Sequence, residues 1–173
     1  MGRFMDEISK FNQNVTSPDG NILLNLSGNS AMTIMFRDDT FEEYHVDELE
    51  GQLVHLFQRG WAVRRSARNR ALTKAVGHKV RDRIPYSSQE RIFREERSKL
   101  SGIGETDNIE VIFSVDEAEW EINISDNAME DLDQDEFIQE LQQASEAAIS
   151  DIREQIINLK DHIYHGHPLR EID

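Results

Sequence analysis

The sequence contains no cysteine, and it lacks the local motifs of several common enzyme classes. The absence of cysteine excludes disulfide bonds and thiol catalysis, and it mildly favours a reducing compartment. There is no nucleophile-elbow motif and no calcium loop with EF-hand spacing. Carboxylate pairs such as Glu119 and Glu121 stand in strongly acidic surroundings, where we expect solvated groups rather than tuned acids or bases. We therefore predict that the protein is not an enzyme and binds no cofactor.

Long apolar runs are also missing. No apolar stretch approaches the length that crosses a bilayer, and the residues after Met1 do not have the pattern of a signal peptide. Apolar residues make up 38% of the chain, which is enough for a modest core. We expect a cytoplasmic protein that makes no membrane contact.

Positive charge is scarce and unevenly distributed. The chain has 19 Lys and Arg against 34 Asp and Glu, which gives a formal net charge of −15. Between Arg64 and Lys99 there are twelve basic residues and four acidic ones, whereas residues 105–151 contain sixteen acidic residues and no Lys or Arg. Two explanations stay open. Either the two blocks face each other, within the chain or across a dimer, or the basic block binds an anionic partner while the acidic half keeps the protein in solution.

One pattern of alternating segments followed by a helical segment occurs twice along the chain. Apolar and polar residues that alternate predict strands, and apolar residues at helical spacing predict helices. Offsets of 87 residues for the first strands and of 88 residues for the later segments align the two copies. The strands are predicted at 22–26, 32–36, 109–113 and 120–124, the hairpin turns at Gly28–Asn29 and Asp116–Glu117, and the long helices from about 47 and 134.

The repeat predicts an α+β fold of two tandem units packed together as a pseudo-dimer. Each unit is expected to contain a short helix, an antiparallel β-hairpin and a long helix, with the first short helix near residues 4–11. Trp61 and Trp120 fall on apolar faces and are expected in the core. We place the first unit at residues 1–78, a basic helical connector that belongs partly to the second unit at 79–104, and the second unit, with its acidic helix and histidine-containing tail, at 105–173.

Turn and cap residues predict boundaries around the connector. Gly77 is expected to end the first long helix, and Ser87 or Ser88 is expected to cap a helix over residues 89–100. Gly102 and Gly104 follow this helix and precede a strand. Because a phosphate-binding glycine loop needs the opposite order, we interpret these two residues as a flexible link into the second sheet.

Two stretches of the chain resemble known families. The segment Trp120–Met129, followed by Asp133–Leu141 and a long helix, resembles the YbaB/EbfC nucleoid-associated family. The first copy, through Val15-Thr16-Ser17-Pro18 and Asp47–Leu53, is similar to the EspD/EspH-type accessory proteins of actinobacterial type VII secretion. These resemblances imply small α+β units that dimerise through sheet and helices and bind DNA or protein without performing chemistry. The acidic second copy departs from a DNA-binding pattern.

Histidines gather near the end of the sequence, at His162, His165 and His167. A metal centre needs three or four ligands that converge from a rigid scaffold. Gly166 and Pro168 are expected to end the helix there, so we interpret the histidines as part of a frayed tail and predict no functional metal site.

The remaining signal for function is a set of cations in the basic block. Arginine pairs well with carboxylates and phosphates. We predict a non-catalytic binding or assembly protein whose partner is another protein or a second copy of itself, with no small-molecule substrate. The alternative is a nucleoid-associated protein that binds DNA through the Arg64–Lys99 block, which the net charge disfavours. The candidate contact residues are Arg64, Arg65, Arg68, Arg70, Lys74, Lys79, Arg81 and Arg83.

Overall fold

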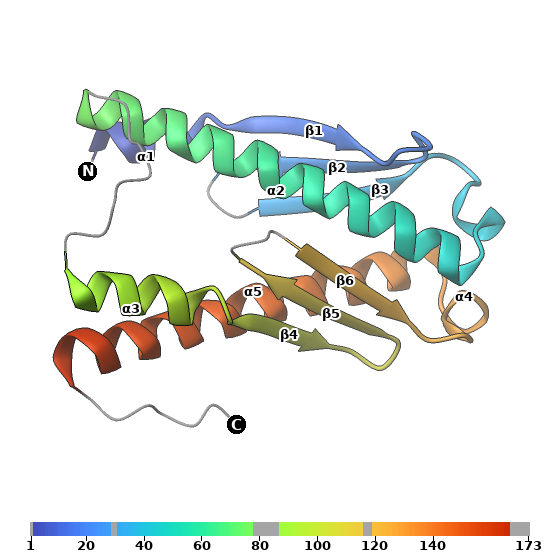
Figure 1. Ribbon diagram of the computed structural model, residues 1–173. Helices are drawn as coiled ribbons and strands as arrows, with labels where there is room; N and C mark the ends of the chain where they lie inside the picture. The colour runs from blue at the N-terminus through green and yellow to red at the C-terminus, as the bar shows by residue number, and fades with distance from the viewer. Residues whose placement is uncertain (1, 29–30, 78–86, 116–118, 167–173) are drawn as a thin grey trace.

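Two halves with the same order of elements make up the chain (Figure 1). The computed structural model describes residues 2–28, 31–77, 87–115 and 119–166. The first half contains α1 (Gly2–Ser9), β1 (Asn12–Thr16), β2 (Ile22–Ser27), β3 (Ala31–Phe36), the short 3-10 helix η1 (Phe41–Glu43) and α2 (Val46–Val76). The second half contains α3 (Ser88–Arg97), β4 (Ser101–Glu105), β5 (Ile109–Ser114), β6 (Glu119–Ile124), α4 (Ala128–Asp131) and α5 (Gln134–His165).

The predicted α+β class is confirmed. A common origin of the two halves stays a prediction.

Of the expected turn residues, Gly28 is described and has a positive φ of 54°, which suits glycine. Asn29, Asp116 and Glu117 lie outside the described residues.

Each half builds a three-stranded antiparallel sheet, in the order β1-β2-β3 and β4-β5-β6. The predicted hairpins are β2–β3 and β5–β6, with Leu24 opposite Ile34 and Val111 opposite Ile122. The outer strands β1 and β4 were not predicted. In β1 only Val15 is buried, so the strand shows no alternation of buried and exposed residues. Short edge strands of this kind carry little periodic signal.

The interpretation of Gly102 and Gly104 as a flexible link is wrong, because both residues belong to β4 where this strand crosses α5. A Cβ atom on Gly102 would lie 2.1 Å from the Ala148 carbonyl oxygen, and one on Gly104 would lie 2.0 Å from that of Ala144. Only glycine permits so close an approach of strand and helix backbones. The two glycines therefore set the distance between β4 and α5.

Capping residues define the ends of the helices. The Asp133 side chain accepts from the Glu136 amide, and Glu136 returns the bond to Asp133, which makes a capping box at the start of α5. Ser87 caps α3, which ends at Arg97, three residues before the predicted end. Gly77 ends α2 in the left-handed conformation, as predicted. None of the described helices combines the length and the apolar character needed to cross a bilayer.

The long helices pack against the sheets of both halves. Figure 1 shows α2 lying along the first sheet and α5 along the second, and α2 also contacts β6 while α5 contacts β3. The rings of Phe57 and Trp120 are 5.1 Å apart, and those of Phe36 and Phe137 are 6.1 Å apart. Most of the buried side chains of both halves form one hydrophobic cluster. The predicted units therefore share a core.

Polar contacts also join the halves. A carboxylate oxygen of Glu50, on α2, accepts a 2.7 Å hydrogen bond from the amide of Ile124 at the end of β6. In the other direction, the Gln142 side chain on α5 donates a 3.1 Å hydrogen bond to the carbonyl of Met32 in β3. Each helix thus holds the backbone of the other half's sheet, which fixes the position of α2 relative to α5.

Candidate anion-binding groove

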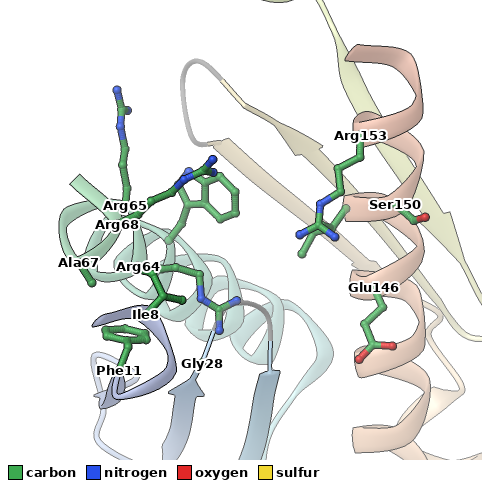
Figure 2. A pocket seen from close by; sticks show the side chains of 12 residues that line it. Ile8, Phe11, Gly28, Arg64, Arg65, Ala67, Arg68, Glu146, Ser150 and Arg153 are labelled. Atoms are coloured by element: carbon green, nitrogen blue, oxygen red, sulfur yellow. The ribbon is translucent and has the colours of Figure 1, made fainter. Parts of the chain in front are cut away.

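A groove of about 520 Å³ lies between α2 and α5 (Figure 2). One wall comes from α2, the opposite wall comes from α5, and the segment around α1 and the end of β2 closes a third side. The groove therefore lies where the two halves meet, at the edge of the shared core. Its lining residues are Trp61, Arg64, Arg65, Ala67 and Arg68 from α2, Glu146, Ile149, Ser150 and Arg153 from α5, and Ile8, Phe11 and Gly28.

Helical spacing explains which side chains line the walls. Trp61, Arg65 and Arg68 follow one another at intervals of three or four residues on α2, so they share one face. Ile149 and Arg153 do the same on α5. The offset of 88 residues that aligns the halves pairs Trp61 with Ile149 and Arg65 with Arg153. Equivalent positions of the two long helices therefore line the groove from both sides.

The base of the groove is apolar. Trp61 is only partly buried, and its ring packs 4.5 Å from that of Phe113. The prediction of a core position is confirmed for Trp120, which is 7% exposed, whereas Trp61 packs against the core and also lines the groove. Ile149 is likewise partly buried against the core. A ligand in the groove would meet apolar surface below and charge at the sides.

The walls are strongly cationic, with four arginines and one glutamate. Arg65, Arg68 and Arg153 are exposed, and Figure 2 shows Arg153 extending from α5 into the space that faces α2. Arg64 is half-buried and donates a 2.7 Å hydrogen bond from Nη2 to the carbonyl of Ala31. Burial and, secondly, the charge of Arg153 lower the pKa of the Arg64 guanidinium, which stays charged at neutral pH. An anion between these arginines would relieve their repulsion.

The structure separates the eight predicted contact residues into three groups. Arg64, Arg65 and Arg68 line the groove. Arg70 and Lys74 are exposed on α2 but do not line it, and Lys74 forms a 2.5 Å ion pair with Glu7 of α1. The rest of the set lies outside the described residues, namely Lys79, Arg81 and Arg83.

Sequence reasoning missed Arg153, because this residue lies outside the basic block between Arg64 and Lys99. The repeat carried a usable signal: an offset of 88 residues places Arg153 on Arg65. Applied to charged as well as apolar positions, the alignment of the two copies would have found the arginine on the opposite wall.

Cations of the basic block also form ion pairs with acidic residues from outside the stretch 105–151. Besides the pair of Lys74 with Glu7, Arg94 pairs with Glu90 at 3.1 Å and Lys99 pairs with Glu96 at 2.7 Å. The acidic run around α4 lies at the opposite end of the molecule from α1 and α3 (Figure 1). The groove that the α2 arginines line holds Arg153 and one residue of the acidic stretch, Glu146, on its opposite wall.

Other candidate groups occupy exposed or structural positions. His162 and His165 are exposed at the end of α5, and His167 lies outside the described residues. Within the described part of the chain, no three His, Asp or Glu side chains gather as a metal site. Glu119 and Glu121 are both exposed, as expected for solvated carboxylates.

Asp19 is the carboxyl group with the richest set of local partners in the first half. Burial opposes its charge, yet hydrogen bonds from Ser17, Tyr44 and the Asn21 amide outweigh burial and lower the pKa of Asp19. Burial and the neighbouring Asp19 raise the pKa of Tyr44. These bonds fix the turn between β1 and β2, so we assign Asp19 a structural role.

No family model matches the chain, and neither does any curated protein or any solved structure. The resemblances inferred from the sequence therefore stay predictions. What can be argued about function rests on the groove.

Proposed function

We propose that the protein is a non-catalytic binding protein that holds an acidic segment of another protein in the groove between α2 and α5. The observation that carries the proposal is the concentration of four arginines around an apolar base in a chain whose formal net charge is −15. Arginine forms paired hydrogen bonds with carboxylates, and apolar surface at the base of a groove suits the apolar side chains of a protein.

The same features fit a protein partner better than DNA. A duplex would bring a long row of phosphates toward a molecule that is acidic as a whole, and this approach is repulsive. Trp61 and Ile149 offer apolar contact that a phosphate backbone cannot use. One observation favours the alternative: Arg65, Arg68 and Arg70 are all exposed on one stretch of α2, and the resemblance to nucleoid-associated proteins implies DNA binding. We therefore keep DNA as the competing ligand in the test.

The test uses defined probes and the full chain. Two fluorescent acidic peptides of identical Leu, Glu, Ala and Gln composition, one with Leu at helical spacing and one with Leu at alternate positions, are titrated alongside a labelled DNA duplex. We expect at least one acidic peptide to bind more tightly than the duplex. Its affinity should fall when the salt concentration rises from about 50 mM to about 300 mM.

Matched charge reversals locate the site. Arg65→Glu and Arg70→Glu change the net charge equally, and both positions are exposed on α2, but only Arg65 lines the groove. Losing one charge-assisted hydrogen bond costs about 1.5–3 kcal/mol, so Arg65→Glu should weaken peptide binding about tenfold or more. Arg70→Glu should have little effect. Equal effects of the two variants, tighter binding of DNA, or no binding of either peptide would overturn the proposal.

A further inference from the structure

The groove face of α5 continues beyond the residues that line the groove. Arg153 is followed at the next turn by Ile157, which at 58% exposure is the most exposed large apolar side chain of the described residues. Tyr164 comes two turns later, but its ring packs 5.9 Å from that of Phe93 on α3, and the Gln89 side chain of α3 donates a hydrogen bond to the Ile163 carbonyl. The open face of α5 therefore ends before Tyr164. At about 100° per residue, Ile157 points within about 40° of the direction of Arg153. Lys160, also exposed, falls on the same face.

The α2 wall has a comparable composition. Trp61 is followed by Arg65 and Arg68, and then by the partly exposed Leu72, one turn beyond Arg68. Both walls therefore carry apolar residues interspersed with cations along their length. Such a row calls for an occupant with a continuous apolar stripe and acidic groups beside it, rather than for a compact anion.

Along the described helices that form its walls, the groove offers no backbone partner for an extended chain. Both walls are α-helices, whose amides and carbonyls are bonded within the helix. The first two carbonyls of β3 already accept side-chain hydrogen bonds, because Arg64 donates to the carbonyl of Ala31 and Gln142 donates to that of Met32. A strand laid between the helices would leave its own backbone polar groups without partners from the protein. A helix satisfies its backbone internally.

Resting on the proposed function, we infer that the occupant of the groove is an amphipathic α-helix with acidic residues on both flanks of its apolar stripe. The stripe packs on Trp61, Ile149 and Ile157. One acidic flank faces Arg65 and Arg68 of α2, and the other faces Arg153 and Lys160 of α5. Ile149 and Lys160 are 11 residues apart, which corresponds to about 16 Å, or about three turns of a bound helix. The partner helix lies between α2 and α5 and contacts both halves.

Comparison of the two acidic peptides tests this inference separately from the proposed function. The peptide with Leu at helical spacing should bind about tenfold more tightly than its alternating isomer, and its helical circular dichroism should increase on binding. A proline at the centre of this peptide should lower its affinity about tenfold, because proline breaks the helix. If the alternating peptide binds more tightly and Arg65→Glu still weakens its binding, the inference of a helical occupant is wrong, while the proposed function is retained. Binding of neither peptide would overturn both.

The length of the occupant is tested at Ile157. Ile157→Ser should weaken binding of the helical peptide about fivefold or more, while the fold is retained because the side chain is largely exposed. Ile103→Ser is the matched control, since Ile103 is 48% exposed and lies on β4, outside the groove lining. If Arg65→Glu abolishes binding and Ile157→Ser behaves like Ile103→Ser, the occupant ends at Arg153 and the inferred three-turn helix is wrong.

Discussion

The two halves bring a long helix onto a sheet in opposite ways. In the first half the small residue is on the helix: a Cβ atom on Gly60 of α2 would lie 2.6 Å from the Leu24 side chain of β2. In the second half the small residues are on the strand, where Gly102 and Gly104 of β4 meet the backbone of α5. The position that corresponds to Gly60 is Ala148, 88 residues later. Both halves need a close approach of helix and sheet. The glycine that permits it lies on the helix in the first half and on the strand in the second.

The walls of the groove differ in a second way. Arg65 and Arg153 correspond, so both walls keep one arginine at that position. Arg64 and Arg68 correspond to Ile152 and Ile156, which pack in or against the core. The α2 wall is therefore mainly cationic, whereas the α5 wall has one arginine beside Glu146, Ile149 and Ser150. The two walls of the groove therefore differ, which would give a bound helix one preferred rotation about its axis.

The largest expected effect tests whether the halves form one folding unit. Phe137 and its counterpart Leu49 are both fully buried, and the Phe137 ring contacts Phe36 and Phe41 of the first half. Phe137→Ala should cost about 3–5 kcal/mol and Leu49→Ala about 2–5 kcal/mol. Each variant should shift a single urea transition followed by tryptophan fluorescence and by circular dichroism. Two separate transitions, with only one of them moved by Phe137→Ala, would show independent halves instead.

The next prediction concerns the glycines. Gly104→Ala places a Cβ atom 2.0 Å from the Ala144 carbonyl oxygen, and because helix backbone cannot move aside locally, we expect a loss of about 3 kcal/mol or more. Gly60→Ala meets only the flexible end of Leu24 and gains helix propensity of about 1 kcal/mol, so its net effect should stay within about 1 kcal/mol of zero. Urea denaturation of the two variants checks the contrast. Comparable losses would mean that the strand glycines do not set the β4–α5 distance.

These glycines also show what the sequence could and could not reveal. The hairpins and long helices were predictable because residues such as Ile22, Leu24 and Leu26 repeat along one buried face. Gly102 and Gly104 have no side chains, so β4 lacks the alternation of apolar and polar residues that predicts a strand. For this reason the sequence predicted a flexible link there. The groove was only half predictable. The α2 arginines stand in a basic block, whereas Arg153 joins them only through the tertiary placement of α5.

The smallest effect concerns the arginine that both walls retain. Burial is the main cause of the lowered pKa of Arg64, and repulsion by Arg153 is the second. Arg153→Gln should relieve that repulsion and raise stability by up to about 0.5 kcal/mol at low salt. The gain should vanish at high salt, and Arg70→Gln, outside the groove lining, should show none of it. If the groove holds an acidic helix, the same Arg153→Gln change should weaken peptide binding while it stabilises the free protein. Opposite signs of the two effects are typical of a residue kept for a ligand rather than for the fold. A loss of both stability and binding would instead assign Arg153 a structural role and leave only α2 to provide charge to the groove.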